Sequence, residues 1–65
     1  MSIKSMRLKA EMTQLQLSFA MGVAQSTVSH WEIGLKKPSN YEVDRLAKIL
    51  NCKVGDISGY DQKSD

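Results

Sequence analysis

One short segment of the chain carries a row of hydrogen-bonding side chains with no formal charge among them. Its members, Gln25, Ser26, Ser29 and His30, recur at helical spacing and share one face with the apolar Ile33. Amide, hydroxyl and imidazole groups match the donors and acceptors that base edges present in the major groove of DNA. A face that is only solvated more often carries lysine and glutamate. The pattern therefore favours base recognition, and the plainer alternative is a set of idle surface side chains.

The same residue types do not add up to a catalytic or metal site. His30 is the single histidine and Cys52 the single cysteine, and neither has a partner at metal-ligand spacing. The sequence also has no nucleophile–base pair, no carboxylate pair in a plausible cleft and no phosphate-binding glycine loop. We therefore expect no enzyme activity, no cofactor and no metal. A chain of 65 residues leaves little room for a pocket, so no small-molecule effector is expected either.

Length and composition indicate one small domain. A net charge of +2 is a weak sign of a polyanionic partner. The unpaired Cys52 fits a reducing compartment. The first ten residues lack the apolar run of a signal peptide, and glutamine and hydroxyl side chains interrupt the segment 12–31, which carries no Asp, Glu, Lys or Arg. We expect a cytoplasmic protein, of a bacterium or a phage-infected cell, with no membrane partner.

Apolar residues that recur every three or four positions predict an all-α fold. The expected helices cover 2–11, 14–21, 25–33 and 39 or 40 to 50, with a last turn at 54–58. Residues 1–58 form the predicted domain and 59–65 a flexible C-terminal tail. The fourth helix should bury its apolar stripe and turn Glu42, Asp44, Arg45 and Lys48 to water. Phe19, Trp31 and the methionines are expected in or near the core.

The second and third helices have the features of a crossing pair joined by a tight turn. Ser18 is a small residue where the two helices would touch, and Gly22 can adopt the left-handed conformation that such a turn requires. Thr13 is a predicted N-cap for the second helix, and Gly34 a predicted stop for the third. The spacing predicts a helix-turn-helix.

These features together resemble the XRE-type helix-turn-helix family, which includes phage repressors and Cro proteins. The resemblance covers residues 3–57 and rests on matching positions in all four helices: Ile3, Met6, Arg7, Met12–Gln14, Leu17, Gly22–Val23, Gln25–Ser29, Trp31–Glu32, Gly34, Pro38 and Leu46–Ala47. It implies a compact four- to five-helix repressor-like domain in which helices 2 and 3 form the motif. Three residues depart from the family pattern: Ser18 in place of alanine, Ala24 in place of a capping hydroxyl, and Leu35 where polar residues are common.

The resemblance also implies roles for individual residues. Base contacts fall to Gln25, Ser26, Ser29 and His30. Contacts to the DNA backbone fall to Gln14, Thr27, Lys36, Lys37, Asn40 and Arg7. Gln14 should also brace Gln25, and Arg7 should form a structural ion pair with Glu32.

The function expected on these grounds is that of a sequence-specific regulator of transcription that binds double-stranded DNA. We expect a repressor that binds a palindromic operator as a homodimer, at least on DNA. The predicted self-contact consists of Leu35, Val54, Ile57 and Tyr60. The alternative is a protein-interaction module of the same fold, such as an antitoxin-like or anti-repressor partner. A protein-interaction module would be expected to carry an apolar or acidic exposed face on the third helix, whereas this face is polar and neutral.

Overall fold

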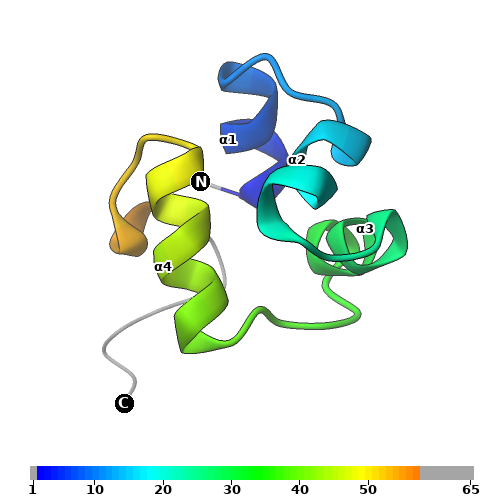
Figure 1. The fold of residues 1–65 in the computed structure, drawn as a ribbon. Helices are drawn as coiled ribbons and strands as arrows, with labels where there is room; N and C mark the ends of the chain where they lie inside the picture. The colour runs from blue at the N-terminus through cyan, green and yellow to red at the C-terminus, as the bar shows by residue number, and fades with distance from the viewer. Residues whose placement is uncertain (1, 58–65) are drawn as a thin grey trace.

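A computed structural model describes residues 2–57, and every regular element in this range is a helix (Figure 1). The elements are α1 (Ile3–Lys9), α2 (Gln14–Met21), α3 (Gln25–Ile33), α4 (Asn40–Ile49) and the 3₁₀ turn η1 (Val54–Asp56). The all-α prediction and the helix-turn-helix are thereby confirmed. The predicted tail over 59–65, including Tyr60, lies outside the described residues.

Three of the helices begin at a reciprocal capping box. The hydroxyl oxygens of Ser2, Thr13 and Ser39 each accept a hydrogen bond from the backbone amide three residues on, and the side chain of that third residue accepts one from the cap amide. These local signals explain why the predicted and observed starts of α2 and α4 agree closely. The first helix is shorter than predicted, because the chain leaves it after Lys9 and Glu11 takes a positive φ of 60°.

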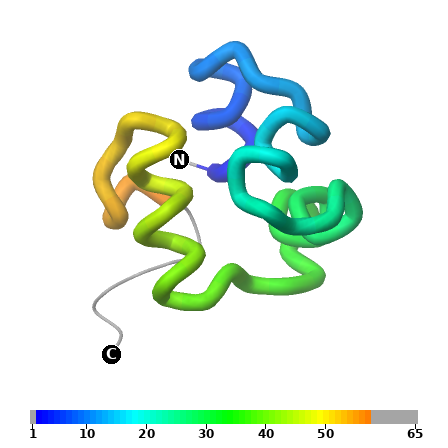
Figure 2. Tube along the Cα trace, in the orientation of Figure 1, coloured from blue at the N-terminus to red at the C-terminus, as the bar shows by residue number. Residues whose placement is uncertain are grey.

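The helices end where a left-handed residue is available. Gly22 (φ 73°) closes α2 and Gly34 (φ 81°) closes α3, while Asn51 (φ 56°) follows α4. In the trace of Figure 2, the tight turn after α2 leads directly into α3, and a longer loop then runs along one edge of the molecule to α4. The turn residues that the sequence predicts therefore set the path of the chain.

The core lies between the four helices and is closed at one side by η1. It consists of apolar side chains of the four α-helices, together with Leu50, which follows α4, and Ile57, which follows η1: Ile3, Met6, Leu17, Met21, Val28, Trp31, Val43, Leu46, Ala47, Leu50 and Ile57. Ser18 is also buried, and its hydroxyl donates a hydrogen bond of 2.7 Å to the carbonyl of Leu15. The small side chain at the crossing of α2 and α3 is thus polar but satisfied.

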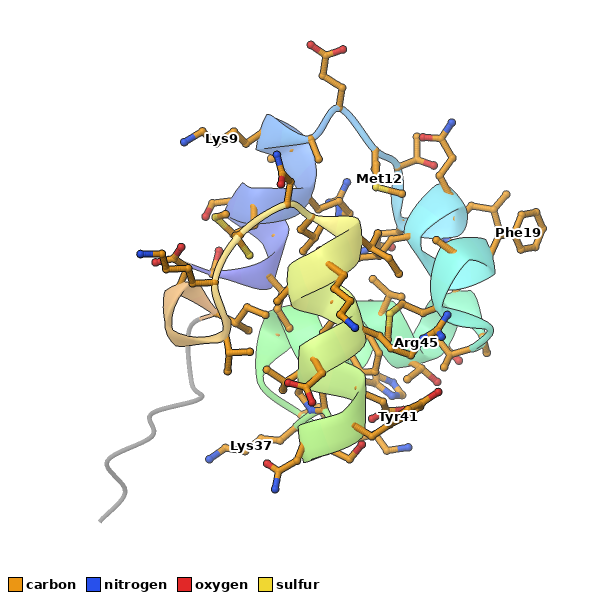
Figure 3. The ribbon with its side chains drawn as sticks, turned by 60° about the vertical axis from the view of Figure 1, so that its left-hand side comes forward. Lys9, Met12, Phe19, Lys37, Tyr41 and Arg45 are labelled. Carbon is orange, nitrogen blue, oxygen red and sulfur yellow. The ribbon has the colours of Figure 1, made fainter. Side chains whose placement is uncertain are left out.

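Two side chains lie elsewhere than the sequence predicts. Phe19 is 77% exposed and points away from the body of the molecule (Figure 3), because it stands about 200° around α2 from the buried Leu17. Arg45 does not turn fully to water. It is half-buried, its Nη2 donates to the carbonyl of Ala20 at 3.1 Å, and its guanidinium lies 6.0 Å from the centre of the Tyr41 ring. Arg45 thus ties α4 to the last turn of α2.

Candidate nucleic-acid interface

The turn between α2 and α3 is closed by backbone hydrogen bonds. The amide of Gly22 donates to the carbonyls of Ser18 and Phe19, and the amide of Val23 donates to the Ser18 carbonyl at 3.0 Å. These bonds satisfy carbonyls that the end of a helix leaves without partners. They also fix the direction in which α3 leaves the turn, and so the face that α3 presents.

The start of α3 has no side-chain cap. Ala24 occupies the N-cap position with extended backbone angles (φ −72°, ψ 152°), and its methyl group can accept no hydrogen bond. The helix therefore begins without the hydroxyl cap that is usual in the family. This helix start depends on its neighbours for stability rather than on a local signal.

Opposite the core, α3 presents the uncharged stripe that the sequence predicts. Val28 and Trp31 are buried, whereas Gln25, Ser26 and Ile33 are exposed. Ser29, His30 and Thr27 are half-buried and flank the exposed positions. The structure therefore brings all four residues predicted to contact bases onto one accessible face of a single helix.

An ion pair fixes the far end of α3 to α1. Arg7 Nε donates to Glu32 Oε2 at 2.6 Å, and Arg7 Nη2 donates to Oε1 at 3.3 Å. The third guanidinium nitrogen, Nη1, donates to the carbonyl of Met12 at 2.8 Å. Both ionic side chains are more than nine-tenths buried, so the pair crosslinks α1, α3 and the segment that leads into α2. The Met12 carbonyl was not predicted, since no side-chain pattern marks a backbone acceptor.

The same geometry changes the role expected of Arg7. Its three guanidinium nitrogens already donate within the chain, and the residue is buried. A direct contact to a DNA phosphate is therefore disfavoured, and Arg7 holds other residues in place instead. Burial alone would raise the pKa of Glu32, but hydrogen bonds from Arg7 and Gln14, and the charges of Arg7 and Lys4, hold that pKa below its ordinary value.

Two glutamines extend this network to the start of α3. Gln14 Nε2 donates to Glu32 Oε1 at 3.0 Å, and Gln25 Nε2 donates to Gln14 Oε1 at 3.5 Å. The second bond is long and therefore weak, so it guides the Gln25 amide without locking it. A continuous chain of polar contacts thus runs from a buried ion pair to the first residue of the exposed stripe.

Basic and polar groups lie in the loop that follows α3. Lys36 and Lys37 are both exposed, and Lys37 points away from the domain in Figure 3. Pro38 is buried and holds this loop against the domain, while Asn40 is exposed at the first position of α4. The cations predicted to meet the DNA backbone thus lie directly beyond the C-terminal end of α3.

The predicted self-contact is only partly available on the surface. Leu35 is exposed, but Val54 is half-buried and packs against the core. Ile57 is only 1% exposed, because its side chain completes the core beside α4. Ile57 is therefore withdrawn from the predicted dimer contact, and Tyr60 lies outside the described residues.

Among residues 2–57, no group of three or more His, Cys, Asp and Glu side chains is close enough to hold a metal ion. None of the helices in this range is long and apolar enough to cross a membrane.

Comparison with known proteins agrees with this geometry. A family model described as helix-turn-helix matches residues 3–57, which is most of the chain. A protein of Archaeoglobus fulgidus named as an uncharacterized HTH-type transcriptional regulator is 34% identical over 61 residues, and the match covers 94% of this chain and 86% of that protein. No solved structure matches the chain significantly. The chain belongs to the XRE-type helix-turn-helix family of DNA-binding regulators.

Proposed function

We propose that the protein represses transcription by binding a specific DNA sequence, with α3 lying in the major groove. The observation that carries this proposal is the chain of contacts from the Arg7–Glu32 pair through Gln14 to Gln25. A surface glutamine with no role needs no such brace. A glutamine that presents its amide to a base edge is helped by a neighbour that guides it toward one orientation.

In this proposal Gln25 binds an adenine through N6 and N7, the bidentate contact that a glutamine amide can make in the major groove. Ser26, Ser29 and His30 contact neighbouring base edges. Backbone contacts come from the groups at the rim of α3: Gln14, Thr27, Lys36, Lys37 and Asn40. Such contacts position the protein on the duplex, while the base contacts supply the sequence preference.

One domain of this size reads too few base pairs to be specific in a genome, so we propose a homodimer on a palindromic operator. Two copies on a two-fold axis would place their α3 helices ~34–36 Å apart, in successive major grooves. The exposed Leu35, next to the end of α3, is the best-placed residue for a contact across the axis. A bound dimer would then repress by covering a promoter element.

Two observations support DNA over the alternative of a protein-interaction module. The exposed face of α3 is neutral and mostly polar, and two exposed lysines follow it in the chain. The relative in Archaeoglobus fulgidus is also named as a transcriptional regulator.

A selection from random duplexes at about 100 mM salt tests the proposal, because at this salt concentration nonspecific binding is weak enough for a preferred site to emerge. Wild type should enrich a two-fold symmetric site, and Gln25→Ala should lose a preference for adenine at one position in each half. Asp44→Ala, which removes an equally exposed side chain from α4, should enrich the wild-type site. If no site is enriched, or if Gln25→Ala selects the same site as wild type, the proposed mode of binding is wrong.

A further inference from the structure

A shallow groove of about 160 Å³ lies between α2 and α4, in a part of the surface that contributes none of the proposed DNA contacts. Its walls come from Ala20 of α2 and from Arg45, Lys48 and Ile49 of α4. None of these residues belongs to α3 or to the loop that follows it. A molecule bound in this groove would therefore not have to displace the residues proposed to contact DNA.

One rim of the groove is apolar. Phe19, which directly precedes Ala20, is 77% exposed, and Leu15, one turn earlier on the same helix, is 48% exposed. Figure 3 shows Phe19 projecting from α2, with Arg45 on the same side of the molecule. Covering Phe19 and Leu15 would be favourable, because it removes apolar surface from water.

The other rim carries two positive charges that no carboxylate neutralises. Arg45 Nη2 donates to the uncharged carbonyl of Ala20 at 3.1 Å, and within residues 2–57 its buried Nε has no hydrogen-bond partner. Lys48 is exposed three positions further along α4. Neither cation forms an ion pair with another of the described residues, and Asp44, the acidic neighbour on the same helix, does not line the groove. The groove is therefore positively charged beside an apolar ridge.

We propose that this surface binds a short acidic peptide segment of another protein. We call it the α2–α4 groove, and it consists of Leu15, Phe19, Ala20, Arg45, Lys48 and Ile49. An apolar side chain of the bound segment would pack on Phe19, and carboxylates next to it would pair with Arg45 and Lys48.

The combination of charge and apolar surface selects this occupant over two others. A DNA phosphate would match Arg45 and Lys48 but would leave Phe19 and Leu15 in water. A second copy of the chain that presents the same face would bring each cation near its own copy, where like charges repel. An acidic segment with an apolar side chain matches both rims.

The size of the groove favours a short segment and weak binding. Pockets that enclose small ligands usually measure ~300–1,000 Å³, so a groove of about 160 Å³ can accept one side chain rather than enclose a whole molecule. A lasting interface between two folded proteins needs about 1,000 Å² or more, which is well beyond two exposed apolar side chains. We therefore expect reversible binding of the kind found in transient complexes.

A selection from a displayed library of random peptides tests the inference, with the full chain as the bait. Wild type should enrich sequences in which acidic residues flank a large apolar residue. A dye-labelled peptide of the enriched sequence then reports the affinity by fluorescence anisotropy. The peptide is the only probe needed, so the measurement does not depend on an operator.

Three variants assign the bound peptide to the groove. Phe19→Ser should weaken binding at least about tenfold, the loss that is usual when a central apolar contact is truncated. Lys48→Glu should also weaken it, and a selection repeated on Lys48→Glu should no longer favour acidic residues. Lys37→Glu makes the same change of charge at an exposed lysine on the opposite side of the molecule (Figure 3), and it should leave the affinity unchanged. Thermal unfolding of each variant establishes that the fold is intact.

Several outcomes would overturn the inference. One is the absence of any enriched peptide, and another is binding that survives either Phe19→Ser or Lys48→Glu. A peptide that Lys37→Glu weakens as much as Lys48→Glu does would be an acidic mimic of DNA. Binding that appears only in Tyr60→Ser/Asp61→Ser would assign the groove to residues 58–65 of the same chain. Self-association that Phe19→Ser abolishes, together with no enriched peptide, would assign it to a second copy. The selection of an operator is a separate measurement, so each of these outcomes leaves the proposed function intact.

Discussion

Glu32, near the C-terminal end of α3, accepts two hydrogen bonds from Arg7 of α1, the shorter of them 2.6 Å long, in a site that excludes almost all solvent. A buried ion pair of this kind is strongly coupled to the fold, because each charge is tolerable only while the other is present. The same carboxylate also accepts the Gln14 amide at 3.0 Å. The stability of the fold and the position of α3 therefore both depend in part on this side chain.

Glu32→Gln should unfold the protein or nearly so. Loss of one partner from a buried ion pair typically costs about 3–5 kcal/mol, which equals the whole stability expected of a core of this size, ~3–5 kcal/mol. The double variant Arg7→Met/Glu32→Leu, which replaces both charges by apolar groups, should recover most of the loss. Urea unfolding followed by circular dichroism measures both. Wild-type stability in Glu32→Gln would show that the ion pair contributes little.

The lowered pKa of Glu32 predicts weakening in acid. A carboxyl whose folded-state pKa lies below its unfolded value contributes stability above the unfolded value and loses it as the pH falls through the folded one. The decline should therefore begin near the ordinary value of 4.5 and be complete only at lower pH. Midpoints of thermal unfolding from pH 7 to acid provide the measurement. The double variant should show a shallower decline, and an unchanged slope would assign the acid sensitivity to other carboxyls.

Ala24→Ser should stabilise the domain. The position already has the extended backbone of an N-cap but no side-chain acceptor, and a serine there typically gains about 0.5–2 kcal/mol. Ala10→Ser, at the C-cap of α1, is a control that adds the same hydroxyl where no start of a helix can use it. Equal effects of the two substitutions in urea unfolding would contradict the capping argument.

Ser18 tests how closely α2 and α3 pack. Ser18→Ala should change the free energy of unfolding by less than about 1 kcal/mol, because it removes one satisfied hydrogen bond and adds a better helix former. Ser18→Leu should destabilise by about 1–3 kcal/mol or more, since the site is fully buried and has no room for the larger side chain. If Ser18→Leu is tolerated, the crossing is looser than the structure indicates.

The salt dependence of operator binding tests the backbone contacts. With ~3–4 phosphates neutralised per subunit, the logarithm of affinity should fall with the logarithm of salt concentration by about 0.9 for each phosphate. Lys36→Ala and Lys37→Ala should each reduce that slope by about one per subunit and leave the preferred sequence unchanged. Lys53→Ala, an exposed lysine beyond α4, should leave the slope unchanged. A change in preferred sequence with either loop lysine would mean that it reads bases.

The features that the sequence predicts well are those set by neighbouring residues. Thr13 and Gly22 fix the start and end of α2 through bonds that span three or four positions, so their effect can be read from the sequence. The Arg7–Glu32 pair spans 25 positions, and it was expected only because the chain resembles a known family.

Other features depend on which surface the rest of the chain happens to cover. Periodicity cannot tell which apolar face of α2 is buried, because both are apolar, and so the exposure of Phe19 was missed. The sequence does not show that Ile57 closes the core, because that role follows only from the return of the chain past α4. Arg45 stands directly before the buried Leu46, so it lies at the border of the buried face of α4. That position in the sequence could have indicated that the Arg45 side chain reaches toward α2.

Among the four α-helices, α3 is the one that begins without a capping box. The helix proposed to read DNA is therefore held in place by the rest of the domain, through Val28 and Trp31 in the core and through Glu32 at its far end. Because α3 has no cap of its own, any stress that weakens these contacts should lower DNA affinity, so that operator occupancy follows the integrity of the fold.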